Sequence, residues 1–281
     1  MVAAFTESMT LVLNEIHFED GFRNPYVIAA ADSRIVDEVR GRVEDKKRKI
    51  FLLPRLRGAV SFFGLAEVWV DDRRKDMSLW LSEFIRTSAD MSSLQSFSEG
   101  LREALRGVVP ETALGATHSG FHICGFRDDD LPDFWFLTNI GKLNDPAPFM
   151  YGDFHPRYDP PSSHFLGRDA RTRFGWNGKD PTSLKALGTR GLSYQMYRNG
   201  DFKPHVIAWD IMDLPLWMLG KFGVLRGPDS PEEHARYLKA KFEFMAAMSE
   251  KFYLVDGKPH VSYIGRPIDV ILMTPDGART I

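Results

Sequence analysis

The sequence predicts an α+β protein, with antiparallel strands that are close neighbours in the chain and helices that cover them from outside. Short apolar runs with the length and bounding turns of strands occupy residues 10–16, 26–32, 49–53 and 58–63. Two stretches with helical spacing of apolar residues follow, and then a hairpin-like strand pair at 120–126 and 133–137. Strands and helices grouped in separate blocks favour antiparallel sheets with helices packed outside them.

Three helices are predicted from their apolar faces and their starts. The first has an apolar face made of Met77, Trp80, Leu81, Phe84 and Ile85. The second begins near Ser92, with Gln95 three residues on as a capping box. A later helix starts at Ser230, where Pro231 fits the first helical position and Glu233 completes a capping box. It leads into closing strands expected at 260–263 and 267–274.

The 281 residues are expected to form a single domain, 1–281, with a proline-rich insertion at about 142–182. This insertion carries four side chains of metal-binding type, namely Asp153, His155, Asp159 and His164. They have no established ligand spacing, so we expect no metal there. The sequence also lacks a nucleotide-binding glycine loop and a zinc motif, so we expect no cofactor.

Composition narrows the classes of partner and the compartment. A formal net charge of −2 argues against a general role on nucleic acid or at a membrane surface. The one cysteine, Cys124, excludes an intramolecular disulfide, and no apolar run approaches the length of a membrane span. The N-terminus lacks a secretory signal pattern, so a cytoplasmic location is expected.

The stretch from Tyr26 to Arg34, Tyr-Val-Ile-Ala-Ala-Ala-Asp-Ser-Arg, organises the chain. It indicates a buried strand of small residues that presents Asp32 at its end, where functional carboxylates are often displayed. Thr10 stands at the start of the preceding strand, and Lys49 opens the strand at 49–53. Simpler interpretations remain open, because Asp32 can cap a local turn and a basic run such as 46–49 is usually a solvated face.

Taken together, these residues resemble the start of a proteasome β subunit or its bacterial HslV-type relative, within the N-terminal-nucleophile (Ntn) hydrolase family. The run Ile264-Gly-Arg-Pro-Ile-Asp-Val resembles the closing strand of the same family. The resemblance implies a four-layer αββα sandwich of two mainly antiparallel sheets between helix layers. We expect the strands that carry Thr10, Asp32 and Lys49 to lie in one of these sheets. The resemblance also implies self-association into a homo-oligomer. The sequence does not indicate whether an ATPase acts as a partner.

By the resemblance, Thr10 is the nucleophile of a threonine-type hydrolase, and its substrate is a peptide or another amide. Lys49 and Asp32 complete the catalytic set, and we expect them to form an ion pair. The supporting residues are expected to be Ser33, Arg34 and Ser262. A threonine hydroxyl needs a base, which the α-amino group of an N-terminal threonine supplies, with a pKa of about 7.7–8.0. His17 lies seven residues on, roughly 23 Å along a strand, so it cannot serve as that base.

A second class of function stays open beside the hydrolase. Nine residues precede Thr10, so its nitrogen is an amide unless the chain is shortened, and Met9 rather than glycine stands before it. The register is also open, because a one-residue slip would turn Thr10 to the other face of its strand. The alternative is an inactive protein of the same fold that serves as a binding or assembly subunit.

Overall fold

A computed structural model describes residues 7–8, 10–19, 23–37, 42–114, 119–140, 151–158, 193–200, 212–255 and 257–281 of the chain. Strands in the first half of the chain are β1 (Glu7–Ser8), β2 (Leu11–Glu19), β3 (Arg23–Asp32), β4 (Ile35–Asp37), β5 (Arg42–Glu44), β6 (Ile50–Leu53), β7 (Gly58–Leu65), β8 (Glu67–Val70), β9 (Arg73–Asp76), β10 (Gly120–Phe126) and β11 (Pro132–Ile140). The later strands are β12 (Tyr151–Tyr158), β13 (Ser193–Gly200), β14 (Leu254–Val255), β15 (Lys258–Pro259), β16 (Ile268–Thr274) and β17 (Gly277–Thr280). The helices are η1 (Pro54–Leu56), α1 (Met77–Thr87), α2 (Leu94–Val108), α3 (Glu111–Leu114), α7 (Asp213–Lys221) and α8 (Pro231–Phe252).

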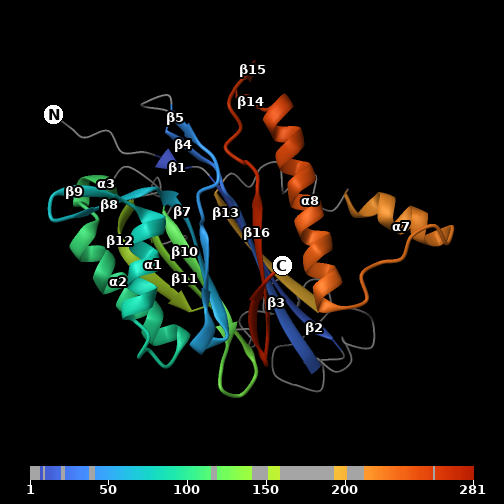
Figure 1. The fold of residues 1–281 in the computed structure, drawn as a ribbon, viewed down its shortest axis with the longest axis horizontal. Coiled ribbons are helices and arrows are strands. Elements are labelled where there is room, and N and C mark those ends of the chain that lie inside the picture. Colours follow the sequence, from blue (N-terminus) through green and yellow to red (C-terminus); the bar gives the residue numbers. More distant parts are fainter. Residues whose placement is uncertain are drawn as a thin grey trace, which may run out of the picture.

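Two antiparallel sheets form the centre of the molecule (Figure 1). The six-stranded sheet has the order β1-β7-β10-β11-β12, and β6 also pairs with β7. The five-stranded sheet has the order β13-β2-β3-β16-β17. In its middle, β3 pairs with β2 on one side and with β16 on the other, so the first and last parts of the chain meet in one sheet.

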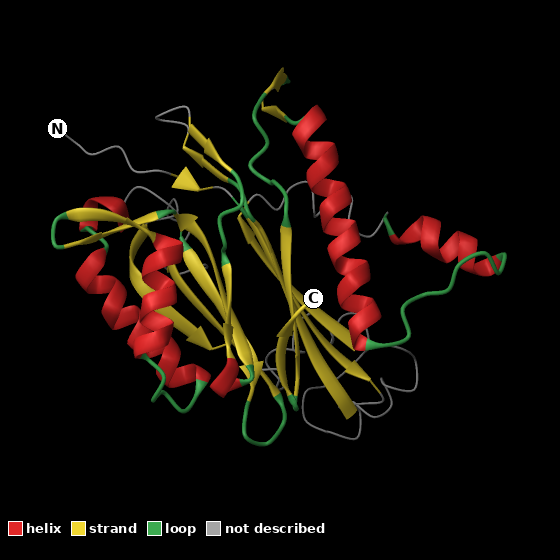
Figure 2. Cartoon of the chain, in the orientation of Figure 1, coloured by secondary structure: helices red, strands yellow, loops and turns green. Residues whose placement is uncertain are grey.

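Three apolar cores hold the sheets and helices together, with helices on the two outer sides and strands between them (Figure 2). The first core packs α1 and α2 on the six-stranded sheet, and it includes Trp80, Leu101 and Phe121. The second lies between the sheets, where Val12 and Ile16 of β2 meet Phe134 and other residues of the facing sheet. The third packs α8 on the five-stranded sheet. This order of elements supports the αββα class, which remains a proposal for this chain.

The pleat of β2 sends alternate side chains to different cores. Val12 and Ile16 lie in the core between the sheets, whereas Leu11 and Leu13 lie in the core under α8. The odd-numbered positions that continue this second face are Glu15 and His17, and both side chains are buried. One strand therefore presents polar groups to two separate environments.

Several sequence-based expectations need correction. We expected the strands that carry Thr10, Asp32 and Lys49 to share a sheet, but Lys49 leads into β6 of the six-stranded sheet, whereas β2 and β3 belong to the five-stranded sheet. Residues 260–263 do not form a strand. The cause is local, because Ser262 hydrogen-bonds its own neighbours in the chain, as described below.

The helix starts follow the capping chemistry with small shifts. Helix α2 is capped by Ser93, which forms a capping box with Ser96 in place of the expected Ser92 and Gln95. Ser230 caps α8 as predicted and accepts the N–H of Glu233. The Glu233 carboxylate accepts the N–H of Asp229, so it does not close the expected box.

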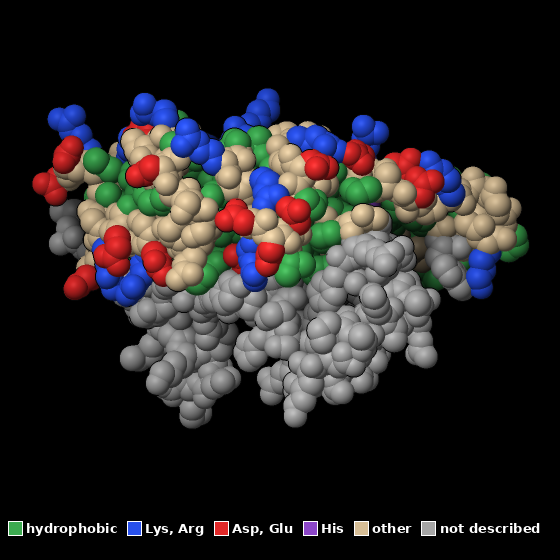
Figure 3. Space-filling view, turned by 90° about the horizontal axis from the view of Figure 1, so that it is seen from below, with side chains coloured by type: hydrophobic (Ala, Val, Ile, Leu, Met, Phe, Trp, Pro, Cys, Tyr) green, Lys and Arg blue, Asp and Glu red, His purple; other side chains and the backbone are tan. Residues whose placement is uncertain are grey.

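The proline-rich insertion predicted at 142–182 lies outside the described residues, apart from the backbone of β12. No described helix combines the length and the apolar character that crossing a membrane requires. On the face seen in Figure 3, Lys and Arg side chains are interspersed with Asp and Glu among the described residues. The described part of that face therefore carries both signs of charge side by side.

Candidate active site

Thr10, Asp32 and Lys49 lie together between the two sheets, and we call them the Thr10 cluster. The Thr10 hydroxyl donates a hydrogen bond to Oδ1 of Asp32 and accepts one from Nζ of Lys49. Lys49 Nζ also lies 3.2 Å from Asp32 Oδ1, so the expected ion pair is present. All three side chains are fully buried. The side chain of Thr10 therefore faces Asp32 and Lys49, which rules out the one-residue slip of its strand.

Backbone N–H groups fix the Asp32 carboxylate from both sides. Its Oδ1 accepts the N–H of Leu11 at 3.0 Å, and its Oδ2 accepts those of Arg34 at 2.9 Å and Gly265 at 3.1 Å. Hydrogen bonds of this kind hold the carboxylate in one orientation. Asp32 thus has a rigid position at the end of β3.

Lys49 is a buried amine with an unusual environment. Burial lowers the pKa of Lys49 from its ordinary value, and the neighbouring Asp32 carboxylate offsets only part of that effect. Besides Thr10 and Asp32, its Nζ donates to the backbone oxygen of Arg34. The neutral amine is thus easier to reach in this site than for a lysine in water. Lys49 can hold Thr10 as an ammonium or, once neutral, accept its proton.

The three expected supporting residues play different parts. Arg34 supplies its backbone N–H to Asp32 and its carbonyl to Lys49, while its guanidinium pairs with Asp45 at 2.7 Å and Glu250 at 3.4 Å. Within the described residues the buried hydroxyl of Ser33 has no hydrogen-bond partner. Its backbone N–H donates to Gly265 across 3.5 Å.

Ser262 acts on the loop and not on the Thr10 cluster. Its hydroxyl donates to the carbonyl of Ile264 at 2.8 Å and accepts the N–H of Ile264 at 3.2 Å. This tight turn presents the N–H of the next residue, Gly265, to Asp32. Sequence reasoning did not single out Gly265, although it quoted the run that contains it. A Cβ at Gly265 would lie 2.6 Å from the Cβ of Arg34, so only glycine fits without movement.

The site is closed in this form of the chain. The sequence joins Thr10 to Met9 through an amide, and Thr10 has no exposed surface. A cavity of about 360 Å³ lies between η1, the start of α2 and the β10–β11 turn, and none of the Thr10 cluster lines it. A substrate would therefore need an opening that this structure lacks among the described residues.

Sequence reasoning missed a second cluster of polar side chains. Glu15 and His17 on β2 meet His234 of α8 on the opposite face of the five-stranded sheet. The strand contributes two residues at i and i+2, which is a weak signal, and the third comes from a helix far along the chain. Only the fold brings them together.

Comparisons with known proteins give little beyond a distant likeness. No family model matches this chain, and no curated protein matches it. A solved structure described as the helical assembly of the Anbu complex from Pseudomonas aeruginosa aligns with a TM-score of 0.45 and 12% identity. The alignment covers 96% of this chain and 86% of that one. A likeness at this level carries no argument about function.

The assignment to the proteasome β subunit or HslV-type family is therefore wrong. It rested on short motifs at the two ends of the chain, and no family model matches the sequence as a whole. A small set of residues at strand ends can be shared by chains whose cores have little sequence in common. Any function must be argued from the groups that the fold brings together.

Proposed function

We propose that this protein hydrolyses amide bonds, in peptides or in another amide, with the hydroxyl of Thr10 as nucleophile once Thr10 is the first residue. One observation carries the proposal: Oγ1 of Thr10 contacts both Nζ of Lys49 and Oδ1 of Asp32 in a fully buried cluster built from two sheets. A threonine hydroxyl held between an amine and a carboxylate is the arrangement that an activated nucleophile requires.

The reaction follows from the groups present. The free α-amino group takes the proton of Thr10 Oγ1 as that oxygen attacks the substrate carbonyl carbon, and it returns the proton to the leaving amine. The acyl group then forms an ester with Thr10, and water cleaves this ester to release the acid. The Lys49 ammonium stabilises the developing alkoxide, and Asp32, fixed by three backbone N–H groups, holds Lys49 in place.

Two alternatives differ in what they require of Thr10. In the first, Lys49 is the base, which its lowered pKa favours, and Thr10 can act without a free amine. In the second, the chain is a binding or assembly protein without turnover. The buried, amide-linked Thr10 favours this second alternative for the full-length form.

The test compares the full-length chain with a shortened chain that begins Met9-Thr10. Methionine is normally trimmed before a small residue such as threonine, so the shortened chain should begin at Thr10, and intact mass verifies this. Both forms are assayed on fluorogenic peptides and with a threonine-reactive electrophile. We expect turnover and labelling in the shortened form alone, and loss of both in its Thr10→Ala variant.

The other outcomes decide between the alternatives. Equal activity in both forms would show that no free amine is needed and would favour Lys49 as the base. Silence in both forms, with a folded shortened chain, would favour the binding or assembly role. Thr10→Ser in the shortened chain serves as a matched control, because it keeps the hydroxyl and should keep activity.

We also propose that the protein self-associates and acts in the cytoplasm. The apolar face of α1 packs into the first core, so we place the contact on another helix. Exposed apolar residues follow one face of α8 instead, at Phe244, Met248 and Phe252. Sedimentation at micromolar concentration, compared with Phe244→Glu, tests this. A monomer in the unmodified protein would refute the contact.

A further inference from the structure

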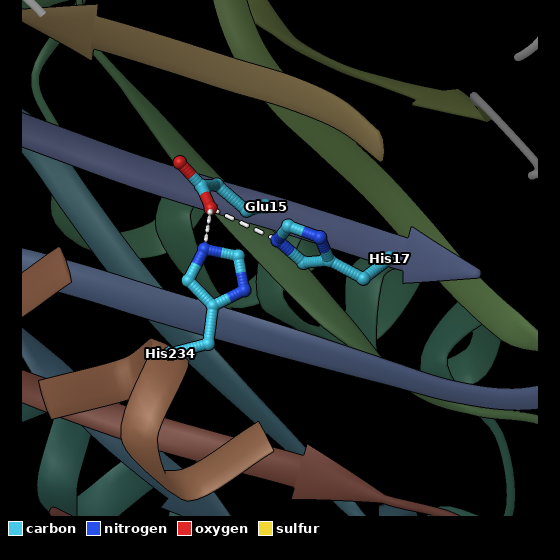
Figure 4. Close-up of side chains that lie close together, drawn as sticks. All are labelled: Glu15, His17 and His234. Carbon is cyan, nitrogen blue, oxygen red and sulfur yellow. Dashed lines mark hydrogen bonds and ion pairs between the residues drawn. The ribbon is translucent and has the colours of Figure 1, made fainter. Parts of the chain in front are cut away.

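The outer face of the five-stranded sheet carries a polar cluster beneath the first turns of α8, well apart from the face that carries Thr10. Glu15 and His17 lie on β2, and His234 reaches them from α8 (Figure 4). We call these three residues the imidazole cluster. Both Nε2 atoms face the same carboxylate oxygen, Glu15 Oε2, at 2.9 Å from His17 and 3.6 Å from His234.

The distances fit a metal ion without a large movement. The three possible ligand atoms all lie within 4.8 Å of one another. Zinc bound at about 2.0–2.1 Å in tetrahedral geometry places its ligand atoms roughly 3.3 Å apart. The two distances to Glu15 bracket that value, so a small shift of the imidazoles would let the three atoms surround one ion.

Neighbouring groups orient the ligands as they do around bound metals. Nδ1 of His234 lies 2.8 Å from the hydroxyl of Tyr26, which leaves its Nε2 toward Glu15. The ring of Tyr26 stacks on His17 with centroids 4.6 Å apart, and this fixes the plane of that imidazole. Partners on the far nitrogen and rigid ring planes are typical of metal-ligating histidines.

The surroundings also suit a cation in charge and in access. Lys241, the nearby cation on α8, is paired with Asp213 at 2.7 Å, so its charge is balanced locally. The His234 side chain keeps 18% of its surface exposed, whereas Glu15 and His17 are nearly closed off. His234 is therefore the member of the cluster through which an ion would reach the other two from solvent.

We propose that Glu15, His17 and His234 form a binding site for one divalent transition metal ion, with Zn²⁺ as the best fit. Two imidazoles and one carboxylate are a common three-ligand set for zinc. The site ties the start of α8 to β2, so binding should stabilise the packing of that helix. The proposal does not depend on the reaction proposed for Thr10.

The experiment uses the full-length chain after removal of metals with a chelator. Titration with Zn²⁺ against a chromophoric competitor should give one site per chain. Co²⁺ in place of Zn²⁺ should give the visible bands of a four-coordinate ion. His234→Gln should weaken Zn²⁺ binding by more than roughly 100-fold, and Tyr26→Phe by about 10-fold to 100-fold.

Matched controls keep the outcome decisive. His260→Gln changes an exposed histidine on the loop after β15 and should leave Zn²⁺ binding unchanged. His234 is partly exposed, so its variant should stay folded, which circular dichroism checks. The proposal is overturned if the unmodified chain binds no Zn²⁺ at micromolar concentration. It is also overturned if His234→Gln binds as tightly as the unmodified chain.

Discussion

The two faces of β2 carry two polar clusters that differ in their chemical groups and in their exposure. Toward the second sheet, the Thr10 cluster joins a hydroxyl, an amine and a carboxylate, all fully buried and saturated with hydrogen bonds. Toward α8, the imidazole cluster directs two nitrogen atoms at one oxygen, and one member is partly exposed. In the proposed reaction the first arrangement controls a proton on Thr10, and in the proposed metal site the second offers lone pairs to a cation.

The difference shows how one strand can serve two purposes without conflict. Alternation along β2 separates neighbouring positions by the thickness of the sheet, so a change on one face leaves the other face in place. His17 illustrates the point, because it lies on the opposite face from Thr10 as well as far along the strand. The following tests treat each cluster as a control for the other.

The largest effect is expected at the nucleophile. Thr10→Ala in the shortened chain should reduce amide hydrolysis by more than roughly 10³-fold, because the attacking oxygen is gone. Zn²⁺ binding should not change, since the imidazole cluster lies on the other face of β2. Parallel rate and metal titrations on one preparation measure both. A loss of metal binding would show that the two faces are coupled.

The next effect is on stability. Asp32→Asn leaves the buried Lys49 amine without its carboxylate, which should lower the free energy of unfolding by about 3–5 kcal/mol. Glu15→Gln, measured without metal, should cost less, about 1–3 kcal/mol, because glutamine keeps one acceptor oxygen for His17 and loses only the charge. Urea denaturation of both variants gives the order. A larger loss of stability in Glu15→Gln than in Asp32→Asn would contradict the view that Asp32 holds the buried Lys49 in place.

A third histidine, His122, is buried between the sheets, and its burial predicts how the stability of the protein depends on pH. His122 accepts from Asn14 at 2.6 Å and donates to Asn199 at 2.6 Å, and burial lowers the pKa of His122 to about 4. The unfolded chain takes up a proton near pH 6.5, but the folded chain does so only near pH 4. The contribution of His122 to the free energy of unfolding is therefore complete above pH 6.5, and about 3 kcal/mol of it is lost as the pH falls to 4.

His122→Gln should remove that part of the pH dependence, whatever its effect at neutral pH. The measurement is urea denaturation from pH 7 to pH 4 in the presence of a chelator, so that no metal contributes. His260→Gln, at an exposed position, is the control. An unchanged slope in His122→Gln would mean that another group causes the acid sensitivity.

The smallest effect is expected in the loop that supports Asp32. Gly265→Ala would place a Cβ 2.6 Å from the Cβ of Arg34, and the required shift should cost about 1–3 kcal/mol. The displaced Gly265 N–H would also weaken its hydrogen bond to Asp32, so activity of the shortened chain should fall. Gly107→Ala, where nothing lies within 4 Å of the added Cβ, is the control.

Sequence reasoning found the members of the Thr10 cluster because each stands at the start or end of a strand, where a local pattern is visible. It could not assign Lys49 to the other sheet, because strand pairing depends on contacts far apart in the chain. Gly265 escaped notice since its role is a backbone N–H, which any residue has. The imidazole cluster escaped because His234 lies on a helix whose packing partner no local pattern reveals.

The chain segments on the two sides of Thr10 belong to different sheets, and this has a consequence if the chain is cut before Thr10. Residues 7 and 8 pair with Gly64 and Leu65 of β7, in the sheet that supplies Lys49, while β2 begins the other sheet at Leu11. Cutting the chain before Thr10 would create the amine and also deprive this part of β7 of its neighbour. The end of β7 would become an unpaired edge, with which an extended backbone from another molecule can form hydrogen bonds. One cut would then create both the free amine of Thr10 and an edge of β7 along which an incoming strand could align.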